Sequence, residues 1–196
     1  MYDYYGIYTS CRDAAWRCII DFDIRTLPIM LKDAANFAGI RIVRNSKIGE
    51  LRGNESGAGI FCEGKWHIIY DDSLSTENSR FVIAHELGHI FLGHEYKYAS
   101  RRFDSDRGKL KCEREADMFA VRLLAPACVL HELKILRADD IAEICMIPKG
   151  VAAERARRMK MLEERGAYYT SPLELQVREK FSDFIAEYRT LYDKNE

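Results

Sequence analysis

The sequence predicts an α+β fold in which a small, mostly antiparallel three-stranded sheet packs on helices and is followed by a C-terminal helical region. Apolar residues recur at helical spacing through most of the chain. Strand-like alternation is confined to three short runs between residues 40 and 70, and beyond residue 136 only amphipathic helical stretches remain. We therefore expect one domain over residues 1–135 and a helical region over residues 136–196.

The size and charge of the chain exclude several classes of protein. Its 196 residues suit one domain, or one domain with a small appendage. Thirty Lys and Arg residues nearly balance 31 Asp and Glu residues, and the resulting net charge of −1 argues against nucleic acid as a partner. No apolar run approaches the roughly 20 residues of a membrane helix, and the N-terminus lacks the pattern of a signal peptide. The six scattered cysteines form no C-x-x-C pair, which is typical of reduced thiols in the cytoplasm.

The first part of the chain contains segments with helical spacing of apolar residues and segments with strand-like alternation. Two helices and three strands are expected there: helices over residues 10–22 and 28–38, and strands over residues 40–43, 57–62 and 65–70. The second helix stops at Gly39, since glycine is a common helix terminator. Glu63 and Gly64 separate the last two strands and are typical of a two-residue hairpin turn.

The rest of the chain is predicted to be helical. Ser75 is expected to cap a helix from about Thr76 to Phe91, whose apolar residues cover more than one face and indicate a buried helix. Residues 95–111 are polar and basic and are expected to form a long loop. The helices expected beyond this loop cover residues 110–124, 138–146, 150–165 and 173–192.

The buried helix carries the sequence His85-Glu86-Leu87-Gly88-His89, which fits the pattern H-E-x-x-H. Residues four apart lie on one helix face, so the two imidazoles can occupy adjacent corners of a tetrahedron around zinc. Glu86 would lie beside the metal, where it can accept a proton from zinc-bound water. A chance match is the alternative, but two imidazoles and a carboxylate are costly to bury without a partner.

A catalytic zinc needs a third protein ligand, and the helix expected over residues 110–124 supplies candidates. Helical periodicity places Glu113 on the apolar face with Ala116, and places Glu115 with Arg122 towards solvent. Glu113 is therefore the expected ligand. Asp117 lies one turn later on the same face, where it can accept the outer N–H of a zinc-binding histidine.

At these two segments the chain resembles a known family. RFVIAHELGHIFLGH followed by CEREADMFAVRLLAP is similar to the ImmA/IrrE family of metallo-endopeptidases, and the resemblance covers about residues 27–126. It implies a zincin-like domain and a gluzincin-like zinc peptidase with His85, His89 and Glu113 as ligands and Glu86 as base. The chain departs from the family at Ala125, where methionine is usual, which is a packing position.

The resemblance also implies a biological setting and a substrate. Members are encoded by bacteria and their mobile elements, often beside a helix-turn-helix transcriptional repressor that they inactivate. The expected substrate is therefore an intracellular protein of that kind. The alternative is a non-proteolytic module that holds zinc for structure and regulates by binding a repressor or DNA. Glu86 favours the enzyme, because a purely structural site would not need a carboxylate beside the metal.

The substrate is expected to bind along one strand. In gluzincin-type peptidases an extended peptide pairs with the edge strand that lies two elements before the motif helix. The matching residues in this chain are Gly57, Ala58, Gly59, Ile60 and Phe61. Their small members would let a second backbone come close, although the glycines could instead accommodate a bulge or a sharp bend.

Several other features stay open or favour a structural role. His94 lies at a helix end and is interpreted as a C-terminal cap rather than a ligand, and alternation turns His67 towards solvent. Residues 138–159 are similar in pattern to a helix-turn-helix, with a small helical bundle as the favoured alternative. Nothing ranks the candidates for stabilising an oxyanion, which are Tyr96, Tyr98, Arg101, Arg102 and Arg122.

Overall fold

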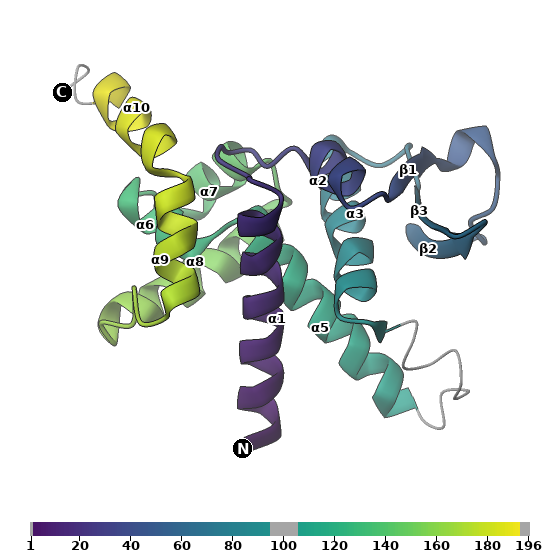
Figure 1. Ribbon diagram of the computed structural model, residues 1–196, viewed down its shortest axis with the longest axis horizontal. Coiled ribbons are helices and arrows are strands. Elements are labelled where there is room, and N and C mark those ends of the chain that lie inside the picture. Colours follow the sequence, from purple (N-terminus) through teal and green to yellow (C-terminus); the bar gives the residue numbers. More distant parts are fainter. Residues whose placement is uncertain (1, 95–105, 193–196) are drawn as a thin grey trace. The chain divides into compact units, whose positions relative to one another are not determined.

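A computed structural model describes residues 2–94 and 106–192 and confirms the predicted α+β class (Figure 1). The described residues group into two compact units. The first lies within Met1–Ala15 and Leu31–Ala120, and the second lies within Trp16–Met30 and Val121–Glu196. All three strands belong to the first unit, and the second unit is helical.

The two predicted N-terminal helices are present with shifted bounds. Helix α1 (Tyr2–Asp21) begins earlier than expected, and α2 (Leu31–Phe37) covers the centre of the second prediction. Gly39 follows with a φ of 70°, a left-handed conformation that glycine adopts without steric cost. The expected helix terminator is therefore confirmed.

The sheet consists of β1 (Arg41–Arg44), β2 (Gly57–Cys62) and β3 (Lys65–Tyr70), with β3 in the middle (Figure 1). β2 and β3 pair antiparallel over six positions, whereas β1 and β3 pair in parallel over four. The hairpin turn at Glu63 and Gly64 has φ values of 51° and 74°, as the predicted two-residue turn requires. Because β2 occupies one side of β3, β1 pairs on the other side. β1 runs parallel to β3, so the sheet is mixed.

Helix α3 (Thr76–Phe91) has the predicted bounds and the predicted cap, since the Ser75 side chain accepts a hydrogen bond from the Asn78 N–H at 3.3 Å. It packs against β2 and β3. Helix α5 (Asp106–Leu124) begins before the predicted start at residue 110. Residues 106–111 are thus helical, so that part of the predicted loop is wrong, and residues 95–105 lie outside the described residues.

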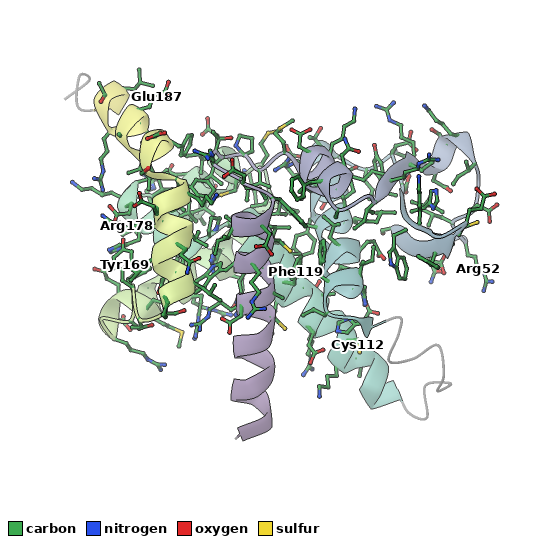
Figure 2. The ribbon with its side chains drawn as sticks, viewed as in Figure 1. Arg52, Cys112, Phe119, Tyr169, Arg178 and Glu187 are labelled. Atoms are coloured by element: carbon green, nitrogen blue, oxygen red, sulfur yellow. The ribbon has the colours of Figure 1, made fainter. Side chains whose placement is uncertain are left out.

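The core of the first unit is built from the central strand and the two long helices that follow it. Its buried side chains include Ile68, Ile69, Ile83, Ala84, Leu87, Ala116 and Phe119. Figure 2 labels Phe119 on α5, where its ring stacks on Phe91 at a centroid distance of 6.0 Å. The six cysteines of the whole chain are free thiols and five of them are buried, as the scattered pattern predicted.

The described part of the second unit contains five helices after α5. These are α6 (Ala127–Glu132), α7 (Ala138–Cys145), α8 (Lys149–Glu164), α9 (Pro172–Lys180) and α10 (Ser182–Tyr192). The stretch predicted as one helix over residues 173–192 is two helices, because the chain breaks at the buried Phe181. Across the described ranges, no helix combines the length and apolar character needed to cross a membrane.

Candidate metal centre

The three predicted ligands converge between α3 and α5. The Nε2 atoms of His85 and His89 are 3.0 Å apart, and Oε2 of Glu113 lies 3.2 Å from the first and 3.8 Å from the second. Tetrahedral ligands about 2.0–2.1 Å from a zinc ion are roughly 3.3 Å from one another. The spacing and the donor types therefore fit a single metal ion held by two imidazoles and one carboxylate.

A glycine in the motif permits this convergence. Gly88 lies on α3 beside His89, and a Cβ added to it would come within 3.1 Å of the Ala116 Cα and carbonyl oxygen on α5. Because glycine has no Cβ, the two helices approach closely at this point. Glu113 lies one turn before Ala116 on α5, so the close approach brings its carboxylate to the histidine pair.

Asp117 contacts His85 as the sequence predicted. Its Oδ1 lies 2.9 Å from Nδ1 of His85, so the ring donates Nδ1–H to the carboxylate and leaves Nε2 to face Glu113 and His89. Burial acts to lower the pKa of His85, but the hydrogen bond to Asp117 and the neighbouring carboxylates outweigh it and raise that pKa. Burial and the positive charges of its histidine neighbours lower the pKa of His89 to about 3.

The position of His94 was not predicted. The C-terminal cap of α3 is Leu92, and His94 lies beyond it with 2% of its surface exposed. Its Nδ1 is 2.9 Å from Nδ1 of His89, and its Nε2 is 2.9 Å from Oε2 of Glu115. The interpretation of His94 as a helix cap is therefore wrong.

The expectation that Glu115 faces solvent is wrong for the same reason. Its side chain is 14% exposed, while that of Glu113 is 46% exposed. Helical periodicity alone implies one solvent face on α5, but His94 contacts the side that carries Glu115. Arg122, placed on that solvent side as well, is also buried.

Glu86 points towards the sheet. A Cβ added to Gly57 would lie 3.3 Å from Oε1 of Glu86 and 2.4 Å from Val82, and one added to Gly59 would lie 3.5 Å from Oε2 of Glu86. The two glycines thus leave room for the Glu86 carboxylate between α3 and β2. The sequence led us to expect that these small residues let the backbone of a substrate come close. On the face where side chains of residues 57 and 59 would lie, the close neighbour is α3 instead.

β2 is the edge strand of the sheet, as the substrate prediction requires. In an antiparallel ladder, hydrogen-bonded and non-hydrogen-bonded pairs alternate. The hydrogen bond from the Asp71 N–H to the Ser56 carbonyl, at 2.9 Å, fixes this alternation. Ala58 accordingly bonds to β3, whereas Gly57, Gly59 and Phe61 direct their backbone N–H and C=O groups to the open edge.

His67 and the oxyanion candidates are the remaining residues that the sequence singled out. His67 is half-buried rather than solvent-facing, and its Nδ1 has no hydrogen-bond partner within the described part of the chain. Of the oxyanion candidates, Tyr96, Tyr98, Arg101 and Arg102 lie outside the described residues.

Comparison with known proteins gave one family. Residues 38–171 match the Peptidase_M78 family, described as the IrrE N-terminal-like domain. This range is more than half of the chain and contains the sheet and both helices of the candidate metal centre. No curated protein matched the chain.

Proposed function

The chain belongs to the IrrE N-terminal-like family of metallopeptidases, and from that premise we propose that it is a zinc-dependent endopeptidase that cleaves an intracellular protein. The observation that carries the proposal is the convergence of His85, His89 and Glu113 beside Glu86. Three protein ligands leave a fourth position for water or substrate, which is the arrangement of catalytic rather than structural zinc sites.

The donor set favours zinc over harder cations. Two imidazole nitrogens and one carboxylate oxygen suit zinc, whereas calcium and magnesium prefer oxygen ligands alone. When bound, zinc supplies Lewis-acid chemistry, polarising the scissile carbonyl and lowering the pKa of water. The carboxylate of Asp117 orients the His85 ring through its Nδ1–H.

Glu86 is proposed as the general base and then the general acid. It lies next to His85 on α3, and the absence of side chains at Gly57 and Gly59 keeps space around its carboxylate. There Glu86 can accept a proton from the attacking water and deliver it to the leaving amine. Its position between the motif helix and the edge strand supports a proton transfer beside a peptide bound along β2.

The proposed substrate is a helix-turn-helix repressor, bound as an extended segment along β2. The resemblance to the ImmA/IrrE family supports the class of substrate. The open backbone groups of Gly57, Gly59 and Phe61 support the binding mode, because an extended peptide can pair with them as an additional strand. The side chains of Ala58 and Ile60 belong to the opposite face of the strand.

The proposal is tested with Glu86→Gln, which removes the base and leaves the three ligands intact. We expect the variant to fold and to hold about one zinc per chain, but to cleave a co-expressed repressor from the neighbouring gene at least about 100-fold more slowly. Wild-type cleavage by this variant would exclude Glu86 as the base. Glu113→Ala, which removes a ligand, serves as the metal-free control.

The second candidate is a zinc-containing module that regulates by binding a repressor or DNA without cleavage. The observation that favours it lies in the second unit, where α7 and α8 pack together and are joined by a short turn through Met146 and Pro148. In that case Glu86→Gln would still inactivate the repressor. Salt-sensitive binding of the protein to duplex DNA would distinguish the DNA-binding form.

A further inference from the structure

We propose that His94 and Glu115 form a relay that positions His89 for the metal, and that they are positioning residues of the centre rather than ligands. The proposal rests on the proposed function. His94 Nδ1 lies 2.9 Å from His89 Nδ1, and His94 Nε2 lies 2.9 Å from the Glu115 carboxylate. The chain of contacts thus runs from the candidate ligand through a second imidazole to a carboxylate.

The positions of the protons follow from the three contacts. His89 uses Nε2 towards the metal, so its neutral ring carries its proton on Nδ1. Only one proton can lie between the two Nδ1 atoms, so His94 accepts there. The neutral His94 ring then carries its own proton on Nε2 and donates it to Glu115. Each atom in the relay has one defined role, and the tautomer of His89 is fixed.

The same assignment of protons distinguishes this relay from a second metal site. His94, Cys112 and Glu115 also place potential ligand atoms within 4.8 Å of one another, and Figure 2 shows Cys112 on α5. A metal on Nε2 of His94 would move the proton of that ring to Nδ1. His89 would then have to accept at Nδ1 and carry its proton on Nε2, where it could no longer bind a metal. With neutral imidazoles, the two clusters therefore exclude each other.

The relay orients the ring of His89 in the way that Asp117 orients the ring of His85 by direct contact. Asp117 accepts Nδ1–H of His85, and Glu115 receives the equivalent interaction from His89 through His94. Both carboxylates come from α5. The Glu115 side chain is 14% exposed and that of Asp117 is 54% exposed, so the relay is better shielded from water. Shielded hydrogen bonds hold a ring more firmly than exposed ones.

Two variants test the relay through metal affinity. His94→Phe keeps a ring of similar size but removes both nitrogens, and Glu115→Gln keeps an acceptor but removes the charge. Replacing a residue that hydrogen-bonds the outer nitrogen of a metal-binding histidine typically lowers metal affinity about 10–100-fold. We expect a zinc affinity lowered by about that factor in His94→Phe and by about 10-fold in Glu115→Gln, measured by competition with a chromogenic chelator. His131→Phe is the matched control, since this half-buried histidine belongs to the second unit.

A second measurement reports on the proton of His89, which a merely structural role of His94 would not affect. In protein loaded with Co²⁺, the Nδ1–H protons of His85 and His89 should give separate, strongly shifted and exchangeable NMR signals. We expect the His89 signal to exchange rapidly with water in His94→Phe, and the His85 signal, held by Asp117, to stay unchanged.

Each outcome decides the proposal. Wild-type zinc affinity and slow exchange in folded His94→Phe would overturn the relay, and if that variant does not fold, unchanged affinity in Glu115→Gln would do so. Saturation of the wild type at about two metals per chain, with one lost in Cys112→Ser, would overturn it in favour of a second metal site. A wild type that binds neither zinc nor Co²⁺ would overturn the proposed function as well.

Discussion

At the scale of single residues, Glu113 and Glu115 show how neighbours on one helix acquire different roles. Glu113 reaches the two Nε2 atoms, while Glu115 contacts only His94 among the three histidines. Glu113→Ala should therefore lose its zinc, whereas Glu115→Ala should still hold about one zinc per chain with lowered affinity. Metal analysis after gel filtration at micromolar protein measures both. The reverse result would assign the ligand to Glu115.

The residues of the centre differ in how far the sequence could reveal them. His85, Glu86 and His89 are adjacent in one motif, and the i, i+4 spacing alone places the two imidazoles together. The contacts of His94 join the end of one helix to the flank of another, and no periodicity within either helix encodes such a contact. A histidine close behind the motif was visible in the sequence, but its burial was not.

At the scale of elements, the approach of α3 to α5 depends on Gly88. An alanine there would normally stabilise a helix by up to about 1 kcal/mol. Its Cβ would instead meet the Ala116 backbone at 3.1 Å, so α5 must shift and carry Glu113 with it. We expect Gly88→Ala to lower both the thermal midpoint and the zinc affinity.

Gly150 provides the control for this substitution. It lies in the first turn of α8, and an added Cβ would meet no atom within 4 Å. Gly150→Ala should leave zinc affinity unchanged and leave the thermal midpoint equal or slightly raised. Calorimetry and chelator competition on both variants make the comparison. Equal zinc affinity in the two variants would show that helix spacing at Gly88 does not set the metal geometry.

The edge strand allows a test of substrate binding with a matched pair of variants. Gly59 directs its N–H to the open edge, so Gly59→Pro removes one donor there and leaves the β3 ladder intact. Gly59→Ala adds a Cβ at the same place, 3.5 Å from Glu86, but keeps the N–H. Cleavage rates at equal zinc content should fall about 10-fold more in the proline variant, because one substrate hydrogen bond is worth about 1.5 kcal/mol. Equal rates would place the substrate elsewhere.

The elements themselves were predictable where local signals are strong. The β2–β3 hairpin and α3 have their expected bounds, because a turn residue or a cap marks each boundary. The start of α5 was not predictable, since residues 106–109 are Asp, Arg, Gly and Lys and show no apolar period. The parallel pairing of β1 could not be inferred either, because the sequence between β1 and the hairpin does not encode the direction in which β1 runs.

At the scale of the whole molecule, the grouping of contacts does not follow the order of the chain. Residues of α1 belong to both units, and so do residues of α5. Composition and linker signals cannot show this, because a continuous helix has no boundary in its sequence. The domain boundary expected between residues 135 and 136 stays a prediction.

The acid stability of the molecule should depend on Glu132 in the second unit. Its carboxylate accepts hydrogen bonds from the Tyr169 hydroxyl, Arg178 and Arg189, each at 2.6 Å, and Figure 2 labels Tyr169 and Arg178. Burial acts to raise the pKa of Glu132, but the three hydrogen bonds outweigh it and lower that pKa. A carboxyl whose pKa is lower in the folded state stabilises the fold above its unfolded pKa, and the stabilisation is lost as pH falls through the folded value.

Glu132→Gln should therefore unfold more easily at pH 7, by about 2 kcal/mol for a charge-assisted hydrogen-bond network that loses its charge. The difference between the wild type and the variant should shrink as the pH falls below the ordinary glutamate pKa of about 4.3, because Glu132 of the unfolded chain then binds a proton that the folded chain binds only at lower pH. Urea unfolding between pH 7 and pH 3 measures the difference, with a chelator present so that metal release does not contribute. Glu132 joins α6 to α9 and α10. If the difference in unfolding free energy stayed constant over this pH range, the packing of the Glu132 side chain, rather than its charge, would hold these helices together.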